Sequence, residues 1–360
     1  MPNHSYADLL AFAQAMLVKA GIAQDAAQVG AEVLIRSDAS GVASHGLSRL
    51  PMYLGRIRQG LVNTSPTVTT VADNGAVLVL DCDNGLGITT VPGIMDRCIE
   101  RAKKHGLAAC TMRNSTHYGV GNYYALKGIE NDVVSVLLTN TTPCMAPTGG
   151  VDLLIGTNPI TVGIPADRQK PIILDMATSN AAMGKLQAMA REGQKIPSDW
   201  AITQDGRPTD DPAEGLNGSL LPIAGYKGYG LAVIVDMLSA VLAGACFGFD
   251  IGRLDRAKVL KPEGIGHFLL VLDVAKFRDV REFKQSVDAY ALLMKNSTRA
   301  EGVREIFLPG ELELNKMDKA ATEGVPISAA LGEQLLAEAK ELGLAGSAGT
   351  FEELLKRTAS

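Results

Sequence analysis

The first sixty residues place apolar side chains at helical spacing between polar ones. Ser5 and Asp8 form the pattern of a capping box ahead of an apolar series over residues 9–20, which is typical of the start of an amphipathic helix. The same spacing recurs over about residues 25–36 and 47–59. The pattern therefore predicts three helices in the N-terminal segment.

The pattern changes near residue 65, where β-branched runs replace the helical spacing. Residues 67–72 and 76–81 flank Asp73-Asn74-Gly75, which is the turn chemistry of a β-hairpin. Apolar runs and helical stretches then alternate, as they do in an α/β domain. Further strands are expected at about residues 107–112, 133–138, 159–164, 171–175 and 267–273, and helices at about 88–105, 122–131 and 229–242.

Helical periodicity returns after residue 275 and continues to the C-terminus, and we expect these helices to pack on the N-terminal ones. With 360 residues, the chain exceeds the roughly 250 to 300 residues at which single cores stop growing. The pattern predicts a helical domain built from residues 1–65 and 305–360, and an α/β domain over residues 66–304. The polar stretch 191–218 is expected to be a surface excursion.

Composition narrows the classes of partner. The formal net charge is −5 and no dense run of Lys or Arg occurs, so neither nucleic acid nor an anionic membrane is expected as a partner. The N-terminus lacks a signal-peptide pattern, and every apolar run is interrupted well short of a membrane span. The five cysteines are far apart and form no C-x-x-C pair, which argues against disulfides and structural zinc. We expect a protein of the reducing cytoplasm that acts on small molecules and holds no metal.

Several common enzyme motifs are absent from the sequence. No G-x-G-x-x-G occurs, because Gly85-Leu86-Gly87 lacks the third glycine and residues 225–230 have the wrong intervals. An ordinary Rossmann fingerprint is thereby excluded. The sequence also lacks G-x-x-x-x-G-K-[ST], H-E-x-x-H and G-x-S-x-G, which argues against an NTPase, a zincin and a serine hydrolase.

Polar loop clusters remain as candidates for a site. The first, residues 114–121, holds His117 between the strand expected at 107–112 and the start of a predicted helix. An imidazole on a glycine-bearing turn in front of a helix N-terminus suits a proton-handling site that tolerates an anion. The competing interpretation is a loop histidine satisfied by backbone groups, and the local pattern alone favours it.

A second cluster, Ser44-His45-Gly46, opens a predicted helix whose first turn carries Arg49. An imidazole and a guanidinium four residues apart share one helix face and together can grip a carboxylate. The alternative is a helix cap with a solvated arginine. The local pattern does not separate the two.

Three further stretches have features that suit a nucleotide. Residues 225–230, which include Lys227, precede an apolar helix, so they suit either a phosphate site or a flexible loop. Asp175 ends an apolar strand, where a carboxylate binds ribose or, more often, caps a turn. Residues 156–159 are by default a plain turn in which Pro159 opens a strand.

Seven motifs occur in the order found in a known family, and together they span more than 260 residues. The chain resembles, essentially end to end, the malate/L-lactate dehydrogenase family of type 2. That family has no Rossmann fold and includes ureidoglycolate dehydrogenase and diketogulonate reductase. The motifs lie at residues 44–51, 114–117, 156–159, 175–178, 226–230, 266–268 and 309–311.

The resemblance implies an NAD(P)-dependent oxidoreductase, usually a homodimer, whose cofactor lies on a sheet unrelated to the Rossmann fold. The reaction it implies interconverts a small 2-hydroxy acid and its 2-oxo acid, of the malate, lactate or ureidoglycolate type, by hydride transfer. NAD and NADP both stay open, because no sequence element identifies the pocket around the ribose 2′ position.

The same resemblance implies roles for individual residues. His117 matches the family's acid/base histidine, and His45 matches a second histidine that is also a candidate proton donor. Ser44 and Arg49 correspond to the anchor of the substrate carboxylate, and Tyr53 lies one helical turn beyond. Thr157 and Asn158 would line the site between cofactor and substrate, and the cofactor would contact Thr141, Asp175, Met176, Ala177, Lys227, Pro309, Gly310 and Glu311.

Two alternatives to a hydroxy-acid dehydrogenase are considered. The family's imine reductases act on cyclic imino acids of the piperideine or pyrroline carboxylate type, and that branch carries a carboxylate just after the glycine matching Gly184. This chain has Lys185 there, so we expect a 2-oxo or 2-hydroxy acid as the substrate. A non-catalytic binding protein would have no need of two histidines, an arginine and a lysine in these motifs.

Overall fold

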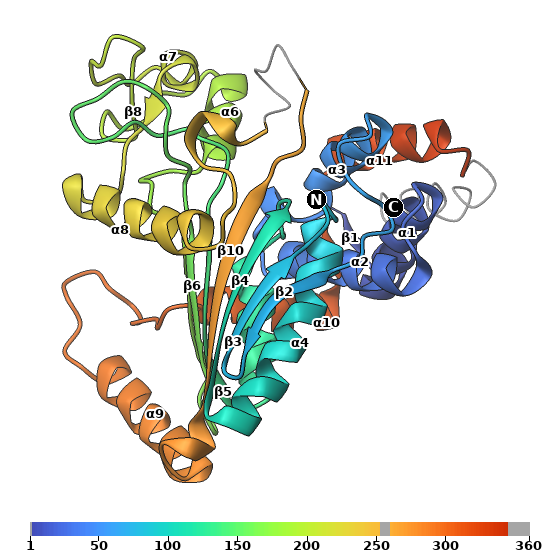
Figure 1. Cartoon of the computed structure of the whole chain (residues 1–360). Coiled ribbons are helices and arrows are strands. Elements are labelled where there is room, and N and C mark those ends of the chain that lie inside the picture. The colour runs from blue at the N-terminus through green and yellow to red at the C-terminus, as the bar shows by residue number, and fades with distance from the viewer. Residues whose placement is uncertain (1, 253–259, 345–360) are drawn as a thin grey trace.

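The computed structural model describes residues 2–252 and 260–344 (Figure 1). Its centre is a seven-stranded sheet in the order β2-β3-β4-β10-β5-β6-β7. β3 and β4 run parallel, whereas the other neighbouring pairs are antiparallel. The strands are β2 (Thr69–Asn74), β3 (Val77–Asp81), β4 (Leu107–Ser115), β5 (Val133–Thr139), β6 (Ile160–Ile164), β7 (Ile172–Met176) and β10 (Ile265–Asp273).

This sheet confirms the expected α/β class and differs from a Rossmann sheet, whose strands are mostly parallel. β10 comes from late in the chain and lies between β4 and β5. It pairs with both neighbours over almost its whole length, so it is protected on both edges. The predicted hairpin is confirmed as β2 and β3, with Gly75 in the left-handed region at φ 71°.

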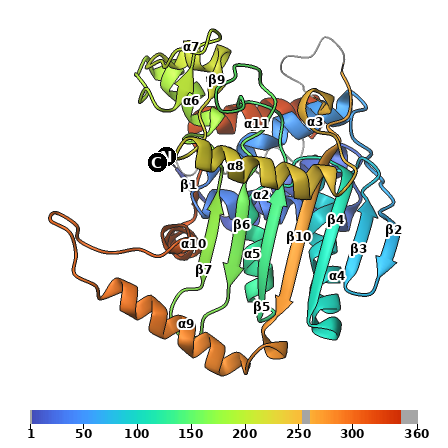
Figure 2. The same cartoon turned by 60° about the vertical axis from the view of Figure 1, so that its left-hand side comes forward.

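Helices cover the two faces of the sheet unequally. α4 (Gly87–His105) and α5 (Gly121–Ile129) pack on one face, with α2 (Gln24–Ala39) behind them (Figure 2). α8 (Tyr226–Asp236), which continues as a π-helical turn (Met237–Val241), lies on the opposite face, while α9 (Val280–Lys295) extends outward from the other end of the strands.

Within the described residues, the N-terminal helices pack with the helices after residue 305, as the sequence predicts. β1 (Asn3–His4) pairs with β11 (Val325–Pro326). Arg58 at the end of α3 (Leu50–Arg58) bridges to two glutamates of α11 (Ala329–Glu341), at 2.8 and 3.2 Å. α1 (Tyr6–Lys19) and α10 (Glu311–Glu323) complete this helical layer.

The division into two domains stays a prediction. One continuous apolar core joins the N-terminal helices to the sheet. The part of the predicted helical domain from residue 345 onward lies outside the described residues.

Capping residues and glycines in the sequence predict where several helices begin and end. Ser5 caps α1 by accepting the Asp8 N–H, at 3.4 Å, and Gly21 follows the helix at φ 100°. The helix expected from residue 47 starts instead at Leu50, because two 3₁₀ turns, Ala43–His45 and Leu47–Arg49, precede it. Further 3₁₀ turns lie at Gly248–Asp250 and Val274–Lys276.

The polar stretch 191–218 is more ordered than the sequence predicts. It follows α6 (Met183–Glu192) and contains β8 (Ala201–Ile202) and α7 (Pro212–Asn217), while β9 (Ser219–Leu220) pairs with β8. Ile196 and Ala201 from this stretch join apolar residues of other segments, among them Met145, Leu186 and Leu220, in a second small core. Within the described ranges no helix is long and apolar enough to cross a membrane.

Candidate active site

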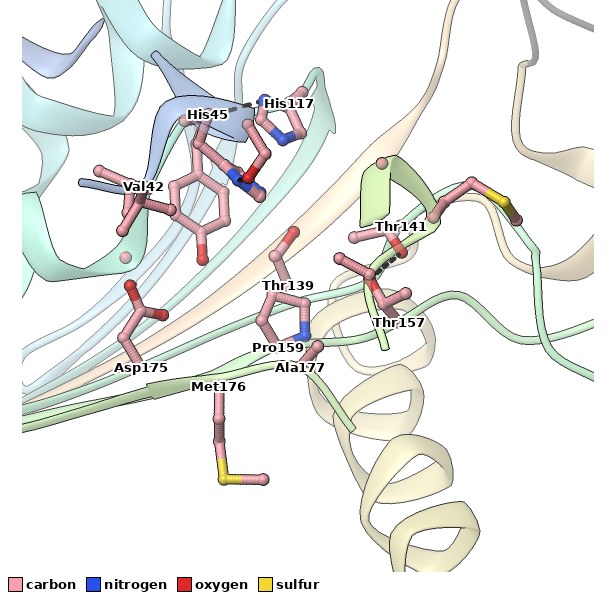
Figure 3. A pocket seen from close by; sticks show the side chains of 18 of the residues that line it. Val42, His45, His117, Thr139, Thr141, Thr157, Pro159, Asp175, Met176 and Ala177 are labelled. Carbon is pink, nitrogen blue, oxygen red and sulfur yellow. Dashed lines mark hydrogen bonds between the residues drawn. The ribbon is translucent and has the colours of Figure 1, made fainter. Parts of the chain in front are cut away.

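A cavity of about 920 Å³ lies at the carboxyl ends of β4 and β7. The turns before α3, α6 and α10 also line it. Residues from segments far apart in the sequence line it. Figure 3 shows His45 and His117 on one side, with Asp175, Met176 and Ala177 at the end of β7 on the other. Thr139 and Thr157 lie between these two sides.

The two histidines form one wall of this cavity. Their ring centroids are 5.4 Å apart and both rings are half-buried. The hydroxyl of Tyr53 lies 2.7 Å from Nδ1 of His117, and the Gly119 N–H donates to the same nitrogen at 3.2 Å. Nδ1 is therefore engaged by the protein, which leaves Nε2 of His117 for a ligand.

The surroundings of both imidazoles favour their neutral forms. Burial, with help from the positive charge of Arg49, lowers the pKa of His45 to about 4. Burial also lowers the pKa of His117 well below its ordinary value of 6.5, and His45, Arg49 and Arg56 act in the same direction. Both rings are consequently neutral at pH 7 in the ligand-free protein.

Arg49 stands beside the histidines. Its Nε donates to the Ser44 carbonyl at 2.6 Å, and the Ser44 hydroxyl lies 2.9 Å from Nδ1 of His45. The sequence predicts that His45 and Arg49 share one face of a regular helix. This prediction is wrong, because Gly46 separates two 3₁₀ turns there. Both nevertheless line the same cavity, so this segment presents an imidazole, a hydroxyl and a guanidinium together.

A buried ion pair on the same wall escaped the sequence analysis. Arg56 and Glu263 are in direct contact, both are buried, and both line the cavity. Glu263 also accepts the backbone N–H of His117 at 3.1 Å, and burial raises the pKa of its carboxyl. Arg56 lies on α3, about two helical turns after Arg49 at the start of that helix, and this spacing is a usable signal. Glu263 has no such local signal.

Asp175 is both a cap and a cavity residue. Its carboxylate accepts the Asn122 N–H at the start of α5, at 2.8 Å, and the Thr161 hydroxyl, also at 2.8 Å. Burial raises its pKa to about 6. A side chain at Gly121 would lie 2.7 Å from this carboxylate, so the start of α5 is already occupied and leaves no room there for a phosphate.

Other predicted site residues line the middle and far end of the cavity. Thr141 and Thr157 face each other, with 3.5 Å between their hydroxyl oxygens. Asn158 is buried behind them, and its Oδ1 accepts the Thr141 N–H at 3.1 Å. It therefore supports the lining rather than forming it. The remaining predicted residues on the lining are Ser44, Met176, Ala177, Pro309 and Gly310.

Besides Asn158, three predicted residues lie off the lining. Tyr53 is fully buried behind His117. Lys227 is exposed at the start of α8 and lies outside the described lining. Glu311 accepts the Leu308 N–H at 3.0 Å and contacts Lys295, so it fixes the turn that presents Pro309 and Gly310.

The residues of the cavity fit a dinucleotide cofactor. Its volume of about 920 Å³ is at the upper end of the roughly 300–1,000 Å³ found for ligand pockets. Hydroxyls and the Asp175 carboxylate suit ribose hydroxyls, and Ile173, Leu314 and Met317 offer apolar contacts for a ring. Within residues 2–252 and 260–344, no group of three or more His, Cys, Asp or Glu side chains is placed to hold a metal ion.

Comparison with known proteins identifies the class. The family model described as malate/L-lactate dehydrogenase matches residues 4–336, and the chain belongs to this family. It is similar to a malate dehydrogenase of Pyrococcus horikoshii, with 34% identity over 94% of this chain and 95% of the relative. The solved structure of malate dehydrogenase from that organism has a TM-score of 0.86 and covers 95% of each chain.

Two further relatives show the breadth of the family. An L-sulfolactate dehydrogenase of Methanocaldococcus jannaschii is 36% identical over 91% of this chain and 94% of the relative. The structure of a delta1-piperideine-2-carboxylate reductase from Pseudomonas syringae has a TM-score of 0.84 at 29% identity, and the match covers 94% of this chain and all of that one. The relatives therefore include both hydroxy-acid dehydrogenases and an imine reductase.

Proposed function

We propose that this protein transfers hydride between a nicotinamide cofactor, NAD or NADP, and a small acid, interconverting a 2-hydroxy acid and its 2-oxo acid. The observation that carries the proposal is the pair of imidazoles, with ring centroids 5.4 Å apart, that faces one cavity beside Arg49. Membership of the malate/L-lactate dehydrogenase family supports the reaction class. Malate, lactate and ureidoglycolate types of substrate all stay within the proposal.

Arg49 and Ser44 bind the substrate carboxylate in this proposal. The planar guanidinium of Arg49 offers two parallel N–H donors, which match the two oxygens of a carboxylate. Its Nε is held by the Ser44 carbonyl, so the side chain is oriented before the substrate arrives. This contact would direct the C2 oxygen of the acid towards the histidines.

His117 moves the proton. In oxidation Nε2 takes the proton of the C2 hydroxyl; the ring must then carry its own hydrogen on Nδ1 and donate it to the Tyr53 hydroxyl, in place of the ligand-free tautomer whose Nδ1 accepts the Gly119 N–H. In reduction the protonated ring returns the proton from Nε2 to the carbonyl oxygen. Tyr53 holds Nδ1 from behind and so fixes the plane of the ring. His45 is the second candidate for this role, since it lines the same wall and its Nδ1 is held by Ser44.

The far side of the cavity holds the cofactor in this proposal. The nicotinamide ring supplies or accepts the hydride, while the protein supplies orientation. Thr141, Thr157 and the end of β7 would contact the cofactor directly, together with Pro309 and Gly310. Asn158 and Glu311 would support these contacts from behind. A contact between Lys227 and the cofactor is proposed only from the resemblance to the malate/L-lactate dehydrogenase family.

The alternative is an NAD(P)H-dependent reductase of cyclic imino acids, because the structure of one imine reductase is similar over most of this chain. Gly184 lines the cavity. The next residue, Lys185, is exposed, and its Nζ lies over the Trp200 ring, 4.3 Å from the ring centroid. No carboxylate therefore reaches the cavity from that position, which favours the 2-oxo acid.

We also propose a homodimer. The sheet face that carries α8 is less covered than the other, and α8 with its π-helical turn exposes an apolar stripe. An exposed stripe of this kind typically marks a protein interface. The free cysteines among the described residues agree with a reducing cytoplasm as the location. The stripe comprises Leu231, Ile234, Met237, Val241 and Leu242.

A cofactor-oxidation screen tests the proposed function. The purified protein is given NADH or NADPH with pyruvate, oxaloacetate, or a cyclic imino acid, and the loss of cofactor absorbance is followed. We expect oxidation of at least one cofactor with a 2-oxo acid, and slower turnover of the imine. A strong preference for the imine would replace our assignment with the alternative, and no turnover of any acid would contradict both.

A further inference from the structure

Helix α2 ends beside the cavity with a buried carboxylate that the proposed mechanism does not use. Asp38 lies in the last turn of α2 and is only 3% exposed. Its Oδ2 accepts the Leu47 N–H at 2.8 Å, across nine residues of sequence. That N–H begins the second 3₁₀ turn (Leu47–Arg49), so the carboxylate holds this turn against α2.

The Asp38 carboxylate is closely packed, and its burial is unfavourable for the stability of the fold. A Cβ atom on Gly46 would lie 2.1 Å from Oδ1 of Asp38, so the contact requires glycine. Oδ1 is buried and has no hydrogen-bond partner among the described residues. Burial raises the pKa of Asp38 to about 7, although the bond from Leu47 opposes this rise. A buried carboxylate with one hydrogen bond destabilises a fold, so its presence calls for another reason.

The segment that Asp38 holds carries the proposed substrate contacts. Ser44, His45 and Arg49 all reach the cavity from it. Inside the segment, the Ser48 hydroxyl donates to the Ala43 carbonyl, and Arg49 donates to the Ser44 carbonyl, both at 2.6 Å. These bonds tie the segment to itself, so they set its shape without fixing where it lies.

Other links to α2 lie just before the segment. The Ser37 hydroxyl donates to the Val42 carbonyl at 2.8 Å, and the Val42 and Gly41 N–H groups donate to the Ser37 and Asp38 carbonyls, both at 2.9 Å. These bonds fix the turn that leaves α2, whereas the bond from Leu47 to Asp38 fixes the far half of the segment, next to Arg49.

We propose that Asp38 is a positioning residue, which holds the 43–49 segment against α2 and so places Arg49 and His45 for the substrate carboxylate. The inference rests on the proposed function for the identity of the ligand. Asp38 itself does not line the cavity within the described residues, so it acts through the backbone of Leu47.

Replacement of Asp38 by alanine tests this inference. The Leu47 N–H loses its acceptor, and the KM for the 2-oxo acid rises by about tenfold or more, the scale of a lost buried hydrogen-bond partner. The affinity for NADH, measured by fluorescence titration, changes by less than about twofold, because the Asp38 carboxylate is hydrogen-bonded to Leu47 and to no residue proposed to contact the cofactor. Asp38→Asn keeps an oxygen acceptor and restores the KM to within about threefold of the wild type.

Two further variants separate positioning from general loss of stability. Ser37→Ala also removes one part-buried hydrogen bond at the end of α2 but spares Leu47, and it keeps the KM of the wild type. Gly46→Ala keeps the aspartate at position 38, but the added Cβ displaces its carboxylate from the Leu47 N–H. The KM therefore rises as in Asp38→Ala. Equal KM values in Asp38→Ala and the wild type, or an equal rise in Ser37→Ala, would overturn the inference.

Hydrogen exchange gives a readout that does not depend on activity. In Asp38→Ala, peptides covering residues 43–49 exchange faster than in the wild type, whereas peptides from β7 and α10 are unchanged. Unchanged exchange in 43–49 would refute the positioning role even in an active enzyme. If the wild type turns over no 2-oxo acid, the proposed function fails, while the exchange difference still supports the link between Asp38 and the segment.

Discussion

At the scale of single residues, the site depends on imidazoles that the protein keeps neutral. Burial and nearby guanidinium groups lower the pKa of His117, and burial with Arg49 lowers the pKa of His45 in the same way. The oxidation of a hydroxy acid needs a neutral base, whereas the reduction of an oxo acid needs a proton on the ring. At neutral pH the ligand-free His117 ring therefore needs no loss of a proton before oxidation, only a shift of its hydrogen from Nε2 to Nδ1.

The pH dependence follows from these lowered pKa values. The kcat/KM for hydroxy-acid oxidation stays level as the pH falls from 8 to 6.5, and declines only below that, since His117 remains neutral. The kcat/KM for oxo-acid reduction rises as the pH falls through the same range, because the small protonated fraction grows. Initial rates in both directions between pH 5 and 9 measure this. An oxidation rate that halves near pH 6.5 would contradict the lowered pKa.

At the scale of elements, local signals predicted most of the fold. The capping pattern at Ser5, the Asp73-Asn74-Gly75 turn and the apolar runs gave α1, the β2–β3 hairpin and five further strands, because each depends on neighbouring residues only. The central place of β10 had no such signal. Its partners, β4 and β5, lie more than a hundred residues away in the sequence.

The candidate site was predictable only in part, for the same reason. His45, Arg49 and His117 stand in recognisable motifs, but the pairing of Arg56 with Glu263 joins α3 to a residue more than two hundred positions later. Residues 47–49 were predicted as the start of a regular helix, because spacing alone does not reveal that Asp38 accepts the Leu47 N–H. The resemblance to a family, rather than local pattern, brought the remaining residues together.

At the scale of the whole molecule, the unequal cover of the sheet makes assembly part of the account. α4 and α5 cover one face, while the apolar stripe of α8 is left on the other (Figure 2). Buried in a homodimer, this stripe would no longer face water.

Charged replacements in the stripe test this assembly. Ile234→Lys with Met237→Glu should shift the protein from dimer to monomer in sedimentation velocity, because charges are costly in an apolar interface. Val18→Lys, a comparably exposed apolar position on α1, serves as the control and should leave the dimer intact. A wild-type protein that sediments as a fully active monomer would contradict the proposed homodimer.

The central claim is that His117 moves the proton in a hydride transfer to a 2-oxo acid. The most direct measurement compares kcat for His117→Ala with that of the wild type and of His105→Ala, an exposed histidine at the end of α4. We predict that His117→Ala loses about 100-fold or more, the usual contribution of acid/base catalysis, while His105→Ala keeps full activity and both variants still bind NADH. A His117→Ala protein that binds the cofactor and turns over at the wild-type rate would contradict the account.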